Sequence, residues 1–135
     1  MSALPPRQHL AAIALVIDDY DTAIEYYTSV LGFVLIEDTE LGPGKRWVRI
    51  SPPGSPQTQL LLAQAATEEQ RARIGNQTGG RVFLFLHTND FERDYALYRT
   101  RGVVFIRGPS HESYGTVAVF EDRYGNRWDL IEPAG

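Results

Sequence analysis

Residues 10–36 read LAAIALVIDDYDTAIEYYTSVLGFVLI, and this stretch decides the fold. It opens with a continuous apolar run at 10–17, which is typical of a strand buried on both faces. Asp18 and Asp19 follow, in the position where carboxylates cap a helix. Gly32 predicts the end of that helix, and the apolar residues 33–36 predict a second strand. The helix itself is marked by an apolar stripe at helical spacing: Tyr20, Ile24, Tyr27 and Leu31.

The second half of the chain repeats this order. An apolar run at 82–86 is followed by Asn89 and Asp90 as a helix cap, and Gly102 predicts the end of the helix. Asp19 and Asp90 are 71 positions apart, close to the separation of 70 between Gly32 and Gly102. Matching caps and stops in the same order indicate an internal duplication. The helical stripe of this half consists of Phe91, Tyr95 and Tyr98.

Turn signals divide the rest of each half into short strands. Residues 42–44 and 108–110 combine Gly and Pro and predict turns, and the Pro-rich segment 51–56 predicts a break. A capping box at 67–70 predicts a short helix to about residue 74, and the polar segment 75–80 joins the halves. The remaining segments predict strands: 46–50, 58–63, 103–106, 116–120 and 126–131.

These elements predict an α+β fold with two βαβββ half-repeats, at about residues 8–66 and 81–133. The half-repeats are expected to form curved mixed sheets around a cavity, and residues 1–135 are expected to form a single domain. The pattern does not say whether the half-repeats pair within one chain or between two chains.

The composition excludes several classes of partner. The chain has 135 residues with a formal net charge of −4, and its Lys and Arg residues form no stripe that would neutralise a nucleic-acid backbone. No apolar run approaches the roughly 20 residues that span a membrane. Because the chain has no cysteine and no secretory signal at residues 1–9, we expect a soluble, cytoplasmic protein that binds neither nucleic acid nor a membrane.

Three segments resemble the vicinal oxygen chelate superfamily, which contains glyoxalases, bleomycin-resistance proteins and extradiol dioxygenases. They are AIALVIDD at 12–19, EYYTSVLGF at 25–33 and FEDRYGN at 120–126. The resemblance covers nearly the whole chain. It implies eight strands in two curved sheets that enclose a small-molecule cavity, and it also implies a homodimer. One fold carries many functions, so the activity depends on the residues of the site.

The resemblance implies a test for a metal centre. Enzymes of this family place metal ligands on the first, fourth, fifth and eighth strands, and the matching positions here are Ala12, Gln59, Val82 and Asp129. Ala12 and Val82 have no donor atom, and two oxygens alone hold a divalent cation weakly. We therefore expect no metal and no other cofactor. If a metal is present, we expect a divalent cation near Gln59 and Asp129.

The three histidines are not expected to complete such a site. His9 lies at the mouth of the first strand, and strand alternation turns His87 toward the helices. His111 lies in the predicted loop 110–115. Because the family closes over its cavity at this position, that loop is the best candidate for a lid.

Strand alternation also predicts the lining of the cavity. Gln59 and Asp129 are the polar groups able to orient a ligand, and Asp129 in an apolar wall is a candidate general base with a raised pKa. Trp47 either fills the core or stacks on a planar or cationic ligand. Further candidates for ligand contacts are Arg46, His111 and Tyr114. The predicted inward-facing wall is small or apolar: Ala12, Ala14, Val16, Leu61, Leu84 and Leu86.

Three hypotheses follow. The first is a small-molecule-binding protein without the usual metal centre, similar to bleomycin-resistance proteins that bind drugs in grooves between two subunits. The second is a metal-dependent lyase or dioxygenase that uses Gln59, Asp129 and a loop histidine at a displaced site. The third is a structural or regulatory domain that binds no ligand. The catalytic residues of an enzyme of this kind are not identified by the sequence.

Overall fold

The computed structural model describes residues 3–54 and 57–135. The predicted Pro-rich break at 51–56 therefore lies partly outside the described residues. In chain order the elements are β1 (Ala12–Ile17), α1 (Tyr20–Glu25), η1 (Tyr26–Val30), β2 (Val34–Gly42), β3 (Lys45–Ser51), β4 (Gln59–Gln64), α2 (Glu68–Ala72), β5 (Val82–His87), α3 (Phe91–Thr100), β6 (Val104–Glu112), β7 (Gly115–Glu121) and β8 (Arg127–Pro133).

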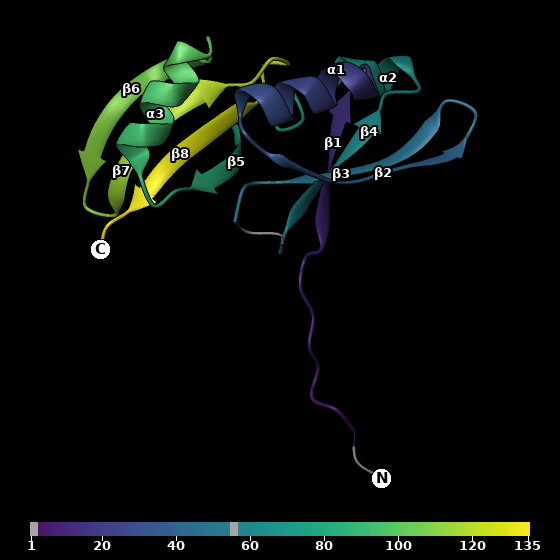
Figure 1. The fold of residues 1–135 in the computed structure, drawn as a ribbon, viewed down its shortest axis with the longest axis horizontal. Coiled ribbons are helices and arrows are strands. Elements are labelled where there is room, and N and C mark those ends of the chain that lie inside the picture. Colours follow the sequence, from purple (N-terminus) through teal and green to yellow (C-terminus); the bar gives the residue numbers. More distant parts are fainter. Residues whose placement is uncertain (1–2, 55–56) are drawn as a thin grey trace.

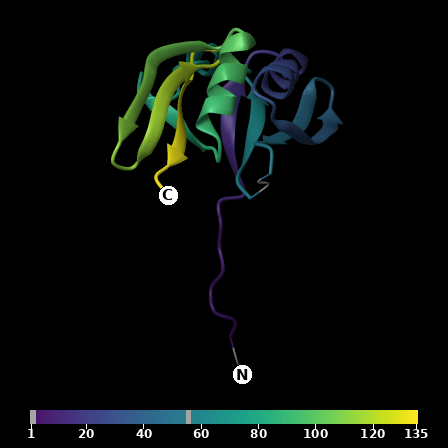
Figure 2. The same ribbon diagram turned by 60° about the vertical axis from the view of Figure 1, so that its left-hand side comes forward.

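The strands form two mixed sheets with the same topology. Sheet A has the order β1-β4-β3-β2, and sheet B has the order β5-β8-β7-β6. In each sheet the first pair is parallel and the other pairs are antiparallel. This repetition confirms the predicted α+β fold with two βαβββ half-repeats. The curved sheets lie side by side, and within one chain they do not close around a cavity (Figures 1 and 2).

Each sheet has one face that packs into the core and one open face. In β1, Leu15 and Ile17 are fully buried in the core, whereas Ala12 and Ala14 on the alternate face are exposed. Leu10 lies before the strand and is 71% exposed. The prediction that residues 10–17 are buried on both faces is therefore wrong, because the helix of the half-repeat covers only one face of its sheet.

The first helix follows the predicted signals. Asp19 caps it by accepting a hydrogen bond from the Thr22 backbone N–H at 2.9 Å. The helix continues from α1 into one π-helical stretch, η1, and Gly32 then takes a positive φ of 74°. Tyr27 and Leu31 of the predicted stripe are buried in the core.

Tyr27 joins the two halves at the centre of the molecule. Its ring packs against Phe33 and Trp128, with ring centroids 6.2 and 6.4 Å away. Its hydroxyl donates a hydrogen bond to Asp122 Oδ2 at 2.6 Å, and Trp128 Nε1 donates to the same oxygen at 3.0 Å. The first helix therefore forms part of the core of both half-repeats.

Sheet B departs from the prediction at its outer strand. The predicted turn at 108–110 is wrong, because β6 runs through Pro109 to Glu112. β6 is an edge strand, where proline removes no hydrogen bond from a neighbouring strand, and its register with β7 shifts between Arg107 and Ser110. His111 therefore lies in a strand and not in a lid loop.

The N-terminal segment and the character of the helices complete the description of the fold. Residues 3–11 run away from the sheets as an extended segment, with every side chain exposed (Figure 1). None of the helices in the described part of the chain has the length and apolar character that a membrane crossing requires.

Candidate functional site

The open face of sheet A combines small, apolar and charged side chains. Residues directly opposite each other in neighbouring strands share a face, and Ala12 is opposite Gln59 while Leu61 is opposite both Ala14 and Arg49. Trp47 precedes Arg49 by two positions and lies on the same face, 40% exposed. Ala12, Ala14, Gln59 and Leu61 thus share the face on which the sequence places them.

A charged cluster on this open face joins β2, β3 and β4. Arg49 donates to Glu37 Oε1 through Nε at 3.0 Å and through Nη2 at 2.8 Å. The third guanidinium nitrogen, Nη1, donates to Gln59 Oε1. These hydrogen bonds from Arg49 lower the pKa of Glu37, which therefore stays ionised. We refer to Glu37, Arg49 and Gln59 as the arginine cluster.

Sequence reasoning missed Arg49 and Glu37. A register shift between Leu35 and Glu37 hides the pairing of β2 with β3 in the sequence. Arg49 itself had one usable signal, because it lies two residues after Trp47 in a strand with alternating polarity.

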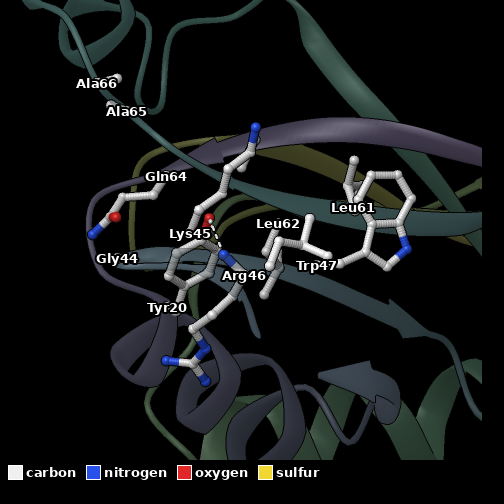
Figure 3. Close-up of a pocket in the computed structure, with 12 residues that line it drawn as sticks. Tyr20, Gly44, Lys45, Arg46, Trp47, Leu61, Leu62, Gln64, Ala65 and Ala66 are labelled. Carbon is white, nitrogen blue, oxygen red and sulfur yellow. Dashed lines mark hydrogen bonds between the residues drawn. The ribbon is translucent and has the colours of Figure 1, made fainter. Parts of the chain in front are cut away.

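A cavity of about 530 Å³ adjoins the open face where β3 and β4 diverge (Figure 3). Pairing of β3 with β4 ends at Val48 and Leu62, although both strands continue. Trp47, Leu61 and Tyr20 all line this cavity. The structure thus places Trp47 in the wall of a cavity and partly exposed, rather than in the core.

Arg46 also lines this cavity, but it is held away from the open face. It forms ion pairs with Asp38 at 2.7 Å and Asp21 at 2.9 Å, and its guanidinium lies 5.1 Å from the Tyr20 ring centroid. Hydrogen bonds to the two carboxylates raise the pKa of Arg46 further above its ordinary value. Its charge is thus compensated by the two carboxylates. Arg46 therefore forms part of the cavity wall and does not offer an unpaired charge to a ligand.

The open face of sheet B carries a carboxylate among apolar side chains. Asp129 lies opposite Phe85 in β5 and opposite Val119 in β7. Phe85 is 63% exposed, which is unusual for a large aromatic residue. Burial raises the pKa of Asp129, and the charge of Arg107 lowers it by a smaller amount.

The predicted parity of β5 is wrong. A register shift between Val82 and Leu84 turns the rest of the strand over, so that Leu84 and Leu86 pack against the core. His87 lies opposite Ile131 and shares the open face with Phe85, instead of facing the helices. The wall of sheet B therefore carries an aromatic ring and an imidazole where the alternation predicts two leucines.

His111 and Tyr114 do not join Gln59 and Asp129. His111 lies on the helix-covered face of sheet B, where its Nδ1 is 3.1 Å from Thr116 Oγ1 and it borders a separate cavity beside α3. Tyr114 lies in the turn between β6 and β7 and is 57% exposed. The six predicted ligand contacts thus divide among several surfaces: Gln59 and Trp47 share an open face, and Asp129 occupies the open face of the other sheet.

The residues at the family's metal positions do not fit a metal. Ala12 and Val82 offer no donor, and Gln59 Oε1 already accepts a hydrogen bond from the Arg49 cation. The positive charge of Arg49 next to that oxygen repels a divalent cation. Asp129 lies on the other sheet, and no group of three or more His, Cys, Asp or Glu residues suited to a metal occurs in residues 3–54 and 57–135.

Comparison with known proteins assigns the chain to a family. The model of the glyoxalase/bleomycin resistance protein/dioxygenase superfamily matches residues 9–130. The chain belongs to this superfamily. An uncharacterised protein of Shewanella frigidimarina (strain NCIMB 400) is 56% identical over 127 residues, which cover 93% of this chain and 94% of that protein. The uncharacterised protein YurT of Bacillus subtilis (strain 168) is 29% identical over 91% of this chain and 98% of its own length.

Two solved structures are similar to this chain over nearly its whole length. UcmS2 has a TM-score of 0.82 and 28% identity, covering 94% of this chain and 99% of its own. TnmS3, described as an antibiotic binding protein from Streptomyces sp. CB03234, has a TM-score of 0.76 and 27% identity, covering 97% of this chain and 100% of its own. The likeness to these proteins extends over both half-repeats.

Proposed function

We propose that this superfamily member binds a small aromatic molecule without a bound metal. The binding site is the cavity formed when the open face of sheet A meets the open face of sheet B from a second copy. The observation that carries the proposal is the pair of open faces themselves. Each presents exposed aromatic surface beside a few fixed polar groups, and this combination is typical of small-molecule sites.

Each open face has a distinct role in this proposal. Sheet A supplies the indole of Trp47 as a stacking surface, with the small side chains of Ala12 and Ala14 leaving room above the sheet. The arginine cluster is held rigid by its own hydrogen bonds and orients polar groups of the ligand. Sheet B supplies the ring of Phe85 and the carboxylate of Asp129.

The arginine cluster also supports binding without a metal. The family resemblance implies a metal ligand at the position of Gln59, whereas here its oxygen accepts a hydrogen bond from a guanidinium. The guanidinium, held in place by a carboxylate and an amide, is a fixed positive charge in the site. A bound metal ion is therefore not required to supply one. The similarity to an antibiotic binding protein over 97% of the chain supports a binding role.

The homodimer is part of the same proposal. The exposed aromatic side chains of Phe85 and Trp47, one on each open face, support this pairing, because a partner or a ligand on these faces would remove their apolar surface from water. Two copies related by a twofold axis would cover both open faces and enclose two equivalent cavities. Sedimentation as a dimer at micromolar concentration is the expected result, and a monomer at all concentrations would contradict this pairing.

The experiment is a thermal-shift screen for ligands, followed by a test of whether binding depends on Trp47. Chelator-treated protein is heated with a panel of uncharged and cationic aromatic compounds, because a compound at 100 times its Kd adds about 2.7 kcal/mol to the free energy of unfolding. The best compound is then titrated calorimetrically. Trp47→Ala is expected to weaken binding at least tenfold, because the stacking surface is lost, and sedimentation of the variant checks that it still pairs as the unmodified protein does.

Tyr114→Ala is the matched control, since Tyr114 is an exposed aromatic residue that lies on neither open face. It is expected to bind as the unmodified protein does. Equal losses in both variants, or no stabilisation by any aromatic compound, would contradict the proposal.

A further inference from the structure

The hydrogen-bonded pairing of β3 with β4 stops where the cavity between these strands begins. The paired residues are Ile50 with Leu60, Arg49 with Leu61 and Val48 with Leu62. Continuing this register would pair Arg46 with Gln64. In the described part of the chain no β3 residue pairs with Gln64, although both residues belong to their strands.

The direction of the missing hydrogen bonds follows from neighbouring contacts. β4 donates to β1 from Gln59 and Ala65, at 3.0 Å to Ala11 O and 2.9 Å to Ile17 O. Backbone groups alternate between the two sides of a strand, so the N–H and C=O of Gln64 point away from β1 and into the cavity.

Tyr20 marks the same gap from the side of β3. Its hydroxyl accepts a hydrogen bond from the Arg46 backbone N–H at 3.4 Å (Figure 3). This is the N–H that a continued ladder would direct at β4. A side chain therefore takes the place of the missing strand partner at Arg46, while the cavity lies next to the backbone of Gln64.

The surroundings of this edge are mainly apolar, and the charge of Arg46 beside it is compensated. Trp47, Leu61 and Leu62 line the cavity, and Arg46 is paired with two carboxylates. Lys45 at the rim is exposed. An uncharged ring with polar atoms along one edge matches such a site better than an ion does.

We propose that this cavity takes a planar, uncharged ring with an adjacent N–H and C=O on one edge, as in a lactam. The ring C=O accepts from the Gln64 N–H, and the ring N–H donates to the Gln64 C=O. This arrangement continues the β4 ladder in the way that an added strand does. The inference rests on the proposed function, because the remainder of the ring contacts Trp47.

The probe is 2-quinolone, a fused aromatic lactam, and its comparator is 1-methyl-2-quinolone, in which a methyl group replaces the donor hydrogen. Binding is followed by NMR titration of isotope-labelled protein. 2-Quinolone is expected to bind about tenfold more tightly than its N-methyl derivative, which corresponds to one hydrogen bond. Hydrogen exchange of the Gln64 N–H is expected to slow on addition of 2-quinolone.

Two variants at one position separate the backbone from the side chain. Gln64→Pro removes the N–H that faces the cavity but no N–H that bonds to β1. Gln64→Ala is the control, because both variants lose the side-chain bond from Nε2 to Asp18 O while only the proline loses the N–H. We expect Gln64→Pro to bind 2-quinolone about tenfold more weakly than Gln64→Ala.

The outcomes distinguish this inference from the proposed function. Aromatic compounds that bind in a Trp47-dependent way, without lactam preference and without slower exchange at Gln64, would overturn the lactam edge alone. Failure of every aromatic compound to bind would overturn both. If Gln64→Pro does not fold, the lactam proposal is still tested by the Gln64 exchange rate in the unmodified protein and by the comparison of the two quinolones.

Discussion

Asp122 shows how one residue holds the two halves of the protein together. Its side chain is buried and accepts hydrogen bonds from Tyr27 of the first half and from Trp128 of the second. It also accepts from the backbone N–H groups of Tyr124 and Asn126, at 2.9 and 3.0 Å. A buried acceptor with this many donors stabilises the fold mainly because its removal leaves those donors without a partner.

Asp122→Ala is expected to lower the free energy of unfolding by about 3 kcal/mol, because it leaves the Tyr27 hydroxyl and the Trp128 indole N–H in the core without an acceptor. Tyr27→Phe removes one donor and leaves the others in place, so its expected cost is about 1.5 kcal/mol. Urea denaturation measures both. Equal effects of the two variants would show that Asp122 acts only through Tyr27.

Asp129 makes the stability of the protein depend on pH. Burial raises its pKa above the ordinary value of 3.8, so the folded protein binds this proton more tightly than the unfolded chain does. The contribution of Asp129 to stability therefore falls as the pH rises from 3.8 through the folded-state pKa, and it stays low above that range. Asp129→Asn is expected to melt at a higher temperature than the unmodified protein at pH 7, and at nearly the same temperature at pH 3.

Melting curves of both proteins across this pH range provide the measurement. A variant that is less stable than the unmodified protein at pH 7 would show instead that the ionised carboxylate is held favourably, with Arg107 as the nearest candidate.

At the scale of single elements, the sequence predicts the helices and most strands but not their irregularities. Caps and glycine stops locate the first helix and α3 because their signals are local. The shift after Val82 and the course of β6 through Pro109 depend on how neighbouring strands pair, which no local pattern encodes. Strand alternation consequently predicts correctly that Ala12 and Gln59 share one face of sheet A, whereas it is wrong about the faces of Leu84 and His87.

The segment that joins the halves is fixed by a close backbone contact. Gly75 follows the short helix α2, has a φ of +73°, and a Cβ built there would lie 1.8 Å from the Tyr124 carbonyl oxygen. The connection between the halves is therefore packed against the turn that precedes β8.

Gly75→Ala is expected to lower the free energy of unfolding by at least 2 kcal/mol, because backbone strain and a steric clash act together. Gly79→Ala is the matched control. Gly79 has nearly the same φ of +70° but no atom within 4 Å of the added Cβ, so only the conformational cost of about 1 kcal/mol applies. Thermal or chemical denaturation of the two variants measures the difference, and equal losses would contradict the packing of Gly75 against Tyr124.

At the scale of the whole molecule, duplication produces two sheets that have the same topology but open faces of different chemistry. Sheet A carries the arginine cluster and Trp47, and sheet B carries Phe85 and Asp129. The sequence predicts that the ligand positions implied by the family resemblance lack imidazoles, because that prediction depends only on which residues occupy those four positions. It does not predict the pairing of Glu37 with Arg49, because these residues meet across strands whose register shifts at Leu35.

The most direct test of metal-independent binding is a calorimetric titration of the best aromatic compound into chelator-treated protein, with and without added Zn²⁺, Ni²⁺, Mn²⁺ or Fe²⁺. We predict the same Kd in every case, since the guanidinium of Arg49 already engages the oxygen that a metal would require. Binding that appears only after a divalent cation is added, together with one tightly bound cation per chain, would contradict the account.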